Sequence, residues 1–483
     1  MLSALMNGPA SAQTAGGEDT RLRLNQGLDR RVAETERQLL KDANDLGAPF
    51  TIEIDGQGYS VGNNVSDIGE AIYAATTRRQ WSDVRRFLRA YLALEGHDPM
   101  LVAYARGALA RVEGRLGEAE RQYRQLLALQ PDFVPGQLEL ARVLFENRKD
   151  REARRAFEAA RAALAGEGDK ASAVRRTIDS FLEALRKRRG WQGSVAIGPG
   201  YSSNLNQSSA SYTCLLAAVD GTCLIDRKVP DPIKAAGINF ESSVNRRIPL
   251  GGQNGIIGRT LFYGDIYPDH NRYGQTTLST QWGYDRRTAR SSITLSPSFD
   301  LGTLGSNILY DAWGIRAEAM VNPSVTTAIR IEVSRRWFNY RPTVYDDHDG
   351  ALTEALLTGW KVLPHGWTLF GGPDFADKTA DSPVNAWRQY GLRLGANKQF
   401  GEAVGLLAFA SFRQRDYRDY SELLEAKRRD REQNFVANLR LPALRLAGLT
   451  PNLLVQHSRV SSTVDWLYSY KRTTLAMRMD YAF

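Results

Sequence analysis

Alternation of apolar and polar residues with a period of two runs through the carboxy-terminal three-fifths of the chain, and this feature limits the possible folds most strongly. In AIRIEVSRR (328–336) two isoleucines and a valine share one parity, opposite Arg330, Glu332 and Ser334. The closing run TTLAMRMDYAF (473–483) follows the same rule and ends on an aromatic residue. Because successive side chains of a strand point to opposite faces, each run is predicted to be a strand with one apolar and one polar face.

The repetition of such runs distinguishes a membrane barrel from a soluble sandwich. About fourteen strand-like runs lie between residues 191 and 483. A sandwich buries apolar residues on each inner face, whereas every strand of a transmembrane barrel has a lipid face and a lumen face. Short connections alternate with long ones, and tryptophans gather near strand ends, as in outer-membrane barrels. The sequence therefore predicts an antiparallel transmembrane β-barrel of about fourteen strands over residues 190–483.

The polar parity of these runs supplies candidate lumen residues, because charges of both signs suit a hydrated interior. The candidates are Arg316, Glu318, Arg330, Glu332 and Arg440. The first and last runs, 191–201 and 471–483, would meet where the barrel closes. Tyr481 and Phe483 are candidate residues of this lateral seam and of the C-terminal barrel signal.

Composition excludes two other classes of protein. No stretch approaches the roughly 20 apolar residues of a membrane-spanning helix, and the mean hydropathy is −0.40. Alternating strands average out in hydropathy, so this value leaves the barrel prediction intact. The net charge of +9 is spread over both halves of the chain without a basic stripe, which argues against a nucleic-acid partner.

The two cysteines and the first residues indicate export. Cys214 and Cys223 lie in a segment bounded by Ser-rich and Asp/Gly/Pro-rich sequence, which favours a disulfide in an oxidising compartment over two incidental thiols. Ala10-Ser11-Ala12 matches the small-residue pattern of a signal-peptide cleavage site. We therefore interpret residues 1–19 as a disordered remnant of a signal peptide.

From about residue 20 to residue 189 the period is helical, except for residues 50–61, which alternate around Asp55-Gly56 and predict a small hairpin. A repeat of 34 residues aligns Gly107, Ala119, Tyr123 and Leu126 with Ala141, Ala153, Phe157 and Ala160. This spacing is typical of tetratricopeptide (TPR) repeats, in which small residues let paired helices approach closely, and we prefer it to generic helical packing. Residues 20–189 are therefore predicted to form a TPR-like helical domain in the periplasm.

Such an array has a concave face that can hold a peptide or protein partner. Polar and aromatic residues of the first helix of each hairpin are expected to line it, although simple solvation also accounts for each of them. The candidates are Tyr104, Arg111, Gln137 and Arg142.

Nothing in the sequence requires catalysis, a metal ion or a cofactor. The five histidines are scattered without metal-ligand spacing. YDDHDG (345–350) could form a hydrolytic dyad or a cation site, but a solvated outer loop accounts for it better. GYSVG, around Ser60, matches a nucleophile motif but falls in the predicted hairpin and not on a strand-to-helix turn. The sequence predicts a conduit and not an enzyme.

A TPR array joined directly to a C-terminal barrel resembles the Slam family, the surface lipoprotein assembly modulators of Gram-negative bacteria. The resemblance runs from about Phe50 to Phe483. It rests on IDGQGYSV, RRQWSDVRRFLRAYLALEGHDP, YRQLLALQPDFVPGQLELARVLFENRKDREARRAF, GPGYSSNLNQSS and the final aromatic strand. It implies a translocon of type XI secretion in the cell outer membrane, with the TPR domain in the periplasm. The implied client is a surface lipoprotein or a soluble secreted protein, often with a role in haem or iron acquisition.

The expected partners are this client, outer-membrane lipids and the barrel-assembly machinery, and the barrel is expected to be monomeric. The array would hold the client near the barrel and raise its effective concentration, before passage through the lumen or the lateral seam. Two other functions stay open. A polysaccharide-export TPR porin would have a longer array and a lumen rich in aromatic residues and one charge sign. A general outer-membrane channel would not explain the helical half.

Overall fold

The computed structural model describes residues 10–40, 61–166, 171–219 and 222–483. Its helices are α2 (Ala10–Leu39), α3 (Val65–Thr77), α4 (Trp81–Leu92), α5 (Pro99–Val112), α6 (Leu116–Leu129), α7 (Val134–Glu146), α8 (Asp150–Ala163), α9 (Ser172–Arg189) and α10 (Asp465–Tyr468). Its strands are β1 (Trp191–Ser202), β2 (Tyr212–Ala217), β3 (Cys223–Lys228), β4 (Ala235–Gly251), β5 (Asn254–Ile266), β6 (Gln275–Arg287), β7 (Ser291–Leu304), β8 (Asn307–Ser324), β9 (Thr327–Tyr340), β10 (Gly350–Val362), β11 (Thr368–Lys378), β12 (Trp387–Phe400), β13 (Val404–Ser421), β14 (Ala426–Arg440), β15 (Leu449–Ser462) and β16 (Tyr470–Ala482).

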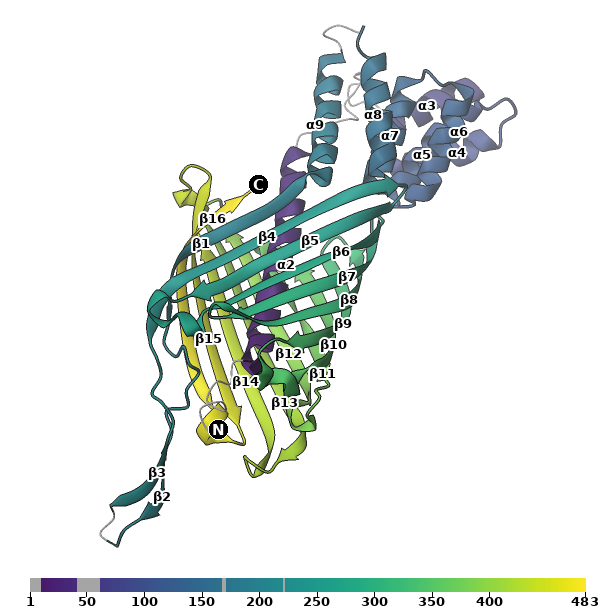
Figure 1. Ribbon diagram of the computed structural model, residues 1–483. Helices are drawn as coiled ribbons and strands as arrows, with labels where there is room; N and C mark the ends of the chain where they lie inside the picture. Colours follow the sequence, from purple (N-terminus) through teal and green to yellow (C-terminus); the bar gives the residue numbers. More distant parts are fainter. Residues whose placement is uncertain (1–9, 41–60, 167–170, 220–221) are drawn as a thin grey trace.

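In the described part of the chain, fourteen strands, β1 and β4 to β16, form one closed antiparallel barrel. The strands follow one another in sequence order, and β1 pairs with both β4 and β16. At the seam, Ser194 lies opposite Ala482 and Tyr201 lies opposite Leu475. Figure 1 shows helices α3 to α9 gathered at the end of the barrel where β1 begins and β16 finishes. The predicted fold class, a TPR-like region followed by a barrel of about fourteen strands, is confirmed.

In each barrel strand, the side chains of odd-numbered and of even-numbered residues lie on opposite sides of the barrel wall. On β9 the side chain of Ile331 is 52% exposed on the outside, while that of Glu332 is 5% exposed on the inside. On β16 Met477 is 65% exposed and Arg478 is 1% exposed. The outer surface is therefore apolar, as lipid requires, and the charged parity faces the interior.

The tryptophans of the barrel strands are found on both the outer and the inner surface of the barrel. Four of them lie on the outside with more than two-fifths of their surface exposed, namely Trp191, Trp282, Trp313 and Trp337. Trp387 is instead buried in a cluster with Tyr340 and Tyr417. Trp387 begins β12, and its place at a strand end predicts an aromatic residue on the outer surface; this prediction is wrong for Trp387, because it shares the parity of the inward-facing Gln389.

Between residues 61 and 166 six helices form three hairpins, α3–α4, α5–α6 and α7–α8. The repeat positions predicted to be small or aromatic are buried where the helices meet. A Cβ on Gly107 of α5 would lie 2.8 Å from the ring of Tyr123 of α6, so any larger residue would push the two helices apart. The 34-residue pattern therefore describes helix packing within each hairpin.

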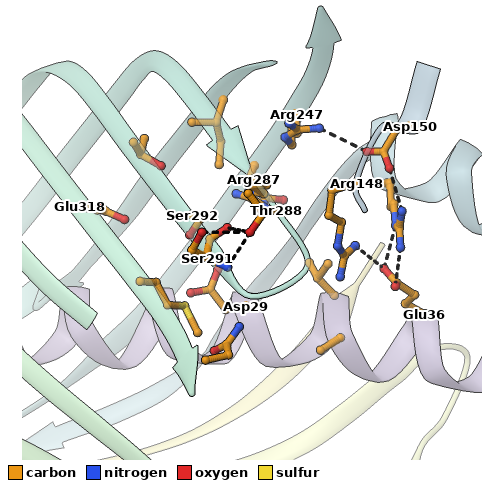
Figure 2. A pocket seen from close by; sticks show the side chains of 18 of the residues that line it. Asp29, Glu36, Arg148, Asp150, Arg247, Arg287, Thr288, Ser291, Ser292 and Glu318 are labelled. Carbon is orange, nitrogen blue, oxygen red and sulfur yellow. Dashed lines mark hydrogen bonds and ion pairs between the residues drawn. The ribbon is translucent and has the colours of Figure 1, made fainter. Parts of the chain in front are cut away.

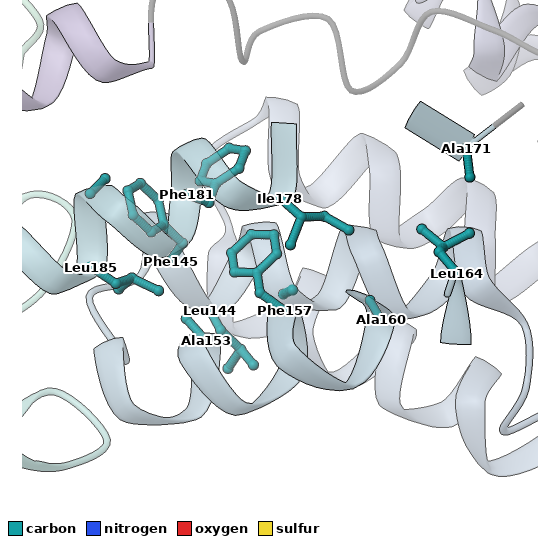
Figure 3. Close-up of a cluster of buried hydrophobic side chains, with 12 residues drawn as sticks. Leu144, Phe145, Ala153, Phe157, Ala160, Leu164, Ala171, Ile178, Phe181 and Leu185 are labelled. Atoms are coloured by element: carbon teal, nitrogen blue, oxygen red, sulfur yellow. The ribbon is translucent and has the colours of Figure 1, made fainter. Parts of the chain in front are cut away.

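The third hairpin continues into α9 through a shared apolar core, shown in Figure 3. Phe157 of α8 stacks on Phe181 of α9 with ring centroids 4.8 Å apart, and Phe145 of α7 meets the same ring edge-on at 4.9 Å. Leu39, at the end of α2, packs against this core. The core thus joins the repeat array to the helix that leads directly into β1.

Helix α2 departs from the predicted domain boundaries. It begins at Ala10, inside the segment 1–19 that was predicted to be a disordered remnant, and it ends at Leu39. Figure 1 shows this helix running inside the barrel and not with the repeat array. The assignment of residues 20–39 to the helical domain is therefore wrong, and ion pairs with the barrel wall supply the physical reason. Apart from Val61, the hairpin predicted over 50–61 lies outside the described residues.

The long connection between β1 and β4 contains a second, separate sheet. Strands β2 and β3 pair antiparallel, and a disulfide joins Cys214 to Cys223 across them. Figure 1 shows this hairpin projecting from the end of the barrel opposite the repeat array. Within the described ranges, no helix combines the length and the apolar character needed to cross a membrane.

The seam between β1 and β16 contains a glycine that has no room for a side chain. A Cβ on Gly198 would meet the carbonyl oxygen of Met477 and would lie 2.8 Å from the Cα of Arg478. We expect Gly198→Ala to weaken barrel closure by about 1–3 kcal/mol, the usual cost of overpacking. Gly359→Ala on β10 is the matched control, because the nearest atom to its Cβ would be 3.9 Å away. Gel mobility after graded heating measures the effect, and equal unfolding temperatures for the two variants would contradict it.

The occupied lumen as candidate functional site

Helix α2 lies within the barrel and is held by strands on every side of it. Five of its charged side chains contact the wall, as follows: Asp19 with β13 and β14, Arg21 with β10, Arg23 with β4, Asp29 with β5 and β9, and Arg31 with β16. These strands are distributed around the closed barrel. A helix that touches all of them must occupy the lumen.

Asp19 anchors the first turns of the helix. Arg413 donates two hydrogen bonds to its carboxylate, at 2.6 and 3.0 Å. Ser411 Oγ and Asn434 Nδ2 donate two more, at 2.7 and 2.8 Å. Asp19 is only 3% exposed, and a buried carboxylate is tolerated only with this kind of complete pairing.

Apolar contacts fill the space between the ion pairs. Leu22 packs into a cluster contributed by five different strands, with Phe370, Phe409, Val436, Leu454 and Ala476. Leu24 and Leu28 are also buried. The helix therefore presents both charged and apolar groups to a wall that matches them.

The next turn of α2 is tied close to the seam. Glu241 of β4 accepts a hydrogen bond from Arg23 of α2 at 2.9 Å and forms an ion pair with Arg478 of β16 at 2.8 Å. One buried carboxylate thus joins α2 to the two strands that flank β1 in the closed barrel.

Two more pairs hold the second half of the helix. Arg330 of β9 donates to Asp29 at 2.6 Å. Arg31 lies 3.2 Å from Asp480 of β16. Because β9 and β16 lie on opposite parts of the ring of strands, these pairs hold α2 from both sides.

A cavity of about 640 Å³ opens beside α2 at the end of the barrel that faces the repeat array. Figure 2 shows Glu36 of α2 pointing toward Arg148 at one edge of this cavity, with Asp150 and Arg247 nearby. Arg188 of α9 donates to Glu36 at 2.7 and 2.9 Å, and Arg148 donates to it at 3.2 Å. Here the lumen helix, the array and the barrel mouth come together.

The structure places all five sequence-predicted lumen residues on the inner wall, namely Arg316, Glu318, Arg330, Glu332 and Arg440. Arg316 and Arg330 both approach Glu332, at 3.5 and 3.7 Å. Glu318 lies 3.7 Å from Arg259, and Arg440 lies 3.2 Å from Asp480. The structure therefore brings Arg316, Arg330 and Glu332 into one network, and Arg330 also binds α2.

The four candidates on the array all make contacts within the array itself. They are Tyr104, Arg111, Gln137 and Arg142. Arg111 of α5 pairs with Glu139 and Glu146 of α7 at 3.3 and 3.0 Å, and Arg142 approaches the same Glu146 at 3.2 Å. The ring of Tyr104 packs edge-on against Tyr123, and Gln137 donates to the carbonyl of Pro131 at 2.7 Å. Among them, Arg111 ties together the first helices α5 and α7 of two neighbouring hairpins.

The two seam candidates lie at the closure of the barrel. Tyr481 is opposite Val195 in the register of β1 and β16. The backbone of Phe483 exchanges two hydrogen bonds with Gly193, at 3.0 and 3.1 Å. The seam is thus hydrogen-bonded up to the last residue of the chain.

The histidine of YDDHDG lies in a short helical turn between β9 and β10, where it packs against the rings of Tyr340 and Tyr345. Burial, with a smaller contribution from the charge of Lys378, lowers the pKa of His348 to about 4, so its imidazole is neutral near pH 7. In the described ranges, His, Cys, Asp and Glu side chains do not gather in threes or more around a possible metal site. Ser60 of GYSVG lies outside the described residues.

Sequence reasoning missed the position of α2, although a signal was present. The helix carries charged residues all round, including Arg21, Arg23, Asp29, Arg31 and Glu36. A helix that packs on a repeat array shows a continuous apolar stripe, whereas a helix that is polar all round needs polar surroundings. The charged inner parity of the barrel provides those surroundings.

Comparison with known families gives matches along most of the chain. A family model described as surface lipoprotein assembly modifier matches residues 191–483, and a second, described as the N-terminal TPR repeats of the surface lipoprotein assembly modifier, matches residues 57–157.

Three relatives illustrate the similarity. A hemophilin secretion modulator of Acinetobacter baumannii is 35% identical, and the match covers 96% of each chain. Surface lipoprotein assembly modifier 1 of Neisseria meningitidis is 24% identical over 89% of this chain and 86% of its own length. Surface lipoprotein assembly modifier 2 of Haemophilus influenzae is 24% identical over 83% of this chain and 81% of its own.

Proposed function

The chain belongs to the surface lipoprotein assembly modifier family, and from this we propose that it delivers a client protein from the periplasm across the outer membrane. Family membership and the closed barrel make it an outer-membrane protein. In our proposal the repeat array stands in the periplasm, where it captures the client. The location of the array beside the barrel mouth supports this role, because a tethered client is present there at high effective concentration.

We propose a soluble secreted protein as the client, in preference to a surface lipoprotein. The relative named for hemophilin secretion is 35% identical over nearly the whole chain, whereas the relatives named for surface lipoproteins are about ten percentage points lower. A client of the hemophilin kind would agree with a role in haem or iron acquisition.

The observation that carries the proposal is the occupied lumen. A passive channel needs an open aqueous path, but α2 fills this lumen and is anchored on all sides. A barrel closed by its own helix, with a protein-binding array at its mouth, suits a route that opens only when a client is present. We therefore propose passage through the lumen after α2 is displaced.

Polysaccharide export fits this site less well. The lumen wall carries paired charges of both signs, such as Arg316 with Glu332 and Arg336 with Asp300. Between residues 61 and 166 the array has three hairpins, which is short for a repeat protein. Mixed charges and a short array both favour a protein client.

The geometry of the wall supports two further parts of the proposal, a monomeric barrel and contact with lipids. The strands close on themselves and leave no free edge, which supports a monomeric barrel. The exposed apolar parity supports direct contact with outer-membrane lipids, and insertion would depend on the barrel-assembly machinery.

Co-expression in a Gram-negative host that lacks family members tests the function. If a neighbouring reading frame encodes a small secreted β-rich protein or a lipoprotein with a lipobox, that protein is the candidate client to co-express. We expect the client in the culture medium to rise at least about tenfold when this chain is present, as expected for delivery that depends on tethered capture. A client that stays in the periplasm equally with and without the chain would contradict the proposal. Protease accessibility on whole cells separates a surface lipoprotein from a released protein.

A further inference from the structure

The cavity at the barrel mouth has an excess of positive charge. Seven arginines and four carboxylates line its 640 Å³. Just behind the lining, Asp285 pairs with Arg247 and Arg287, and Glu332 pairs with Arg330, so these two carboxylates neutralise part of this excess. Arginines remain in the majority, so the cavity is suited to a ligand with several carboxylates.

One carboxylate already occupies this cavity edge, and it belongs to α2. Glu36 receives two hydrogen bonds from Arg188 and one from Arg148 (Figure 2). Arg188 also donates to Asp150 at 2.7 Å, and Asp150 forms an ion pair with Arg247 of β4 at 3.2 Å. A continuous chain of charges therefore joins the lumen helix to the array and to the barrel.

The two sides of this contact differ in how firmly they are held. The guanidinium of Arg188 lies 3.7 Å above the ring of Phe145, and its side chain is 8% exposed. The side chain of Glu36 is 19% exposed and borders the open cavity. An incoming carboxylate can therefore reach Arg148 and Arg188 from the cavity, and Glu36 is the partner that can leave.

We propose that this cavity binds an acidic segment of the client, whose carboxylates replace Glu36 on Arg148 and Arg188 and so detach the array-side end of α2, as the first step of its displacement from the lumen. The identity of the segment as part of a client rests on the proposed function. An acidic ligand is required because simple loss of Glu36 would take from Arg148 its ion-pair partner and would leave the buried Arg188 with Asp150 alone. Exchange of one carboxylate for another keeps both arginines paired throughout, so this end of α2 is freed without that penalty.

Binding of labelled hexaglutamate to the purified full-length protein tests the site. The probe and Glu36 compete for the same arginines, so Glu36→Gln should bind it about tenfold more tightly than the unmodified protein, within the usual range of coupling between sites. Arg148→Gln combined with Arg188→Gln should bind it at least about tenfold more weakly. Glu34→Gln, whose carboxylate pairs with Arg30 on the same helix, should bind as the unmodified protein does. Unchanged or weaker binding by Glu36→Gln would overturn the proposal.

Current through single barrels in a planar bilayer tests the release of α2. Hexaglutamate on the array side should increase the time spent open, and hexalysine should not. The chain has no cysteines besides the bridged pair Cys214 and Cys223, so Glu36→Cys with Arg148→Cys can be cross-linked specifically by a short bismaleimide. The cross-linked protein should no longer respond to hexaglutamate, whereas the same variant before cross-linking should already open spontaneously.

The acidic site, the release of α2 and the delivery of the client can each fail separately in these experiments. Hexaglutamate that binds but leaves the current unchanged would overturn the release of α2. Neither measurement contains a client, so their failure would leave the translocation proposal intact. Loss of client delivery in the co-expression test, with hexaglutamate still opening the barrel, would contradict the proposed function and not the acidic site.

Discussion

Deletion of Ala10–Leu39 is expected to convert a closed barrel into a conducting pore. The barrel itself should still form, because each of its fourteen strands in the described chain is hydrogen-bonded through its backbone to two neighbouring strands. None of these backbone pairings involves α2. Without the helix, the charged inner parity would face water, as the interior of a porin does. The ion pairs that now cross the lumen, such as Arg413 with Asp19, would be replaced by hydration.

Planar-bilayer recording measures this change directly. We expect the mean current per barrel to rise at least about tenfold, because barrels much larger than eight strands enclose an aqueous channel unless they are plugged. Cells that produce the deleted protein should also become sensitive to large hydrophilic antibiotics that the outer membrane normally excludes. Heat-modifiable gel mobility must confirm that the variant is folded.

A matched control separates loss of the plug from general disturbance of α2. Arg30 and Glu34 pair with each other on the helix, with 37% and 45% of their side chains exposed. Arg30→Gln with Glu34→Gln changes the same helix but removes none of the pairs with the wall that are described above, so its current should stay at the low level of the unmodified protein. A folded deletion variant with the same low current would show that something other than α2 closes the lumen.

Deletion of Val65–Ala163, which removes the three hairpins but keeps α9 and the barrel, is expected to abolish client delivery. Tethering on the array gives the client an effective concentration near the millimolar range, whereas a free periplasmic client is far more dilute. We expect delivery in the co-expression test to fall by about 100-fold, which is the typical gain from such tethering. The barrel should remain in the outer membrane with unchanged heat-modifiable mobility.

The two deletions should therefore have different effects. The variant without α2 is expected to leak ions while it still delivers client, because its array is intact. The variant without the hairpins also lacks Arg148, so it is expected to show some leak, but it should deliver no client. Client delivery that survives removal of the hairpins would contradict the role of the array.

Local sequence patterns were sufficient to predict the two architectures. Alternation along β9 and β16 already separates the lipid face from the lumen face, because the direction of each side chain in a strand depends only on its parity. The small and aromatic positions of the repeat, such as Gly107 with Tyr123, likewise predict how neighbouring helices pack. One pattern repeats every two residues and the other every 34, and both describe which face of an element must avoid water.

The position of α2 was decided only by the tertiary structure. Its anchoring contacts join residues that are far apart in the sequence, such as Asp19 and Arg413, which are 394 positions apart. No local pattern encodes which arginine on which strand will meet a given carboxylate, and a helix with charges all round has no preferred apolar surface. The closed lumen and the arginine-rich cavity beside Glu36 exist because strands from the whole circumference bring their charges to one helix, and that convergence depends on the completed barrel.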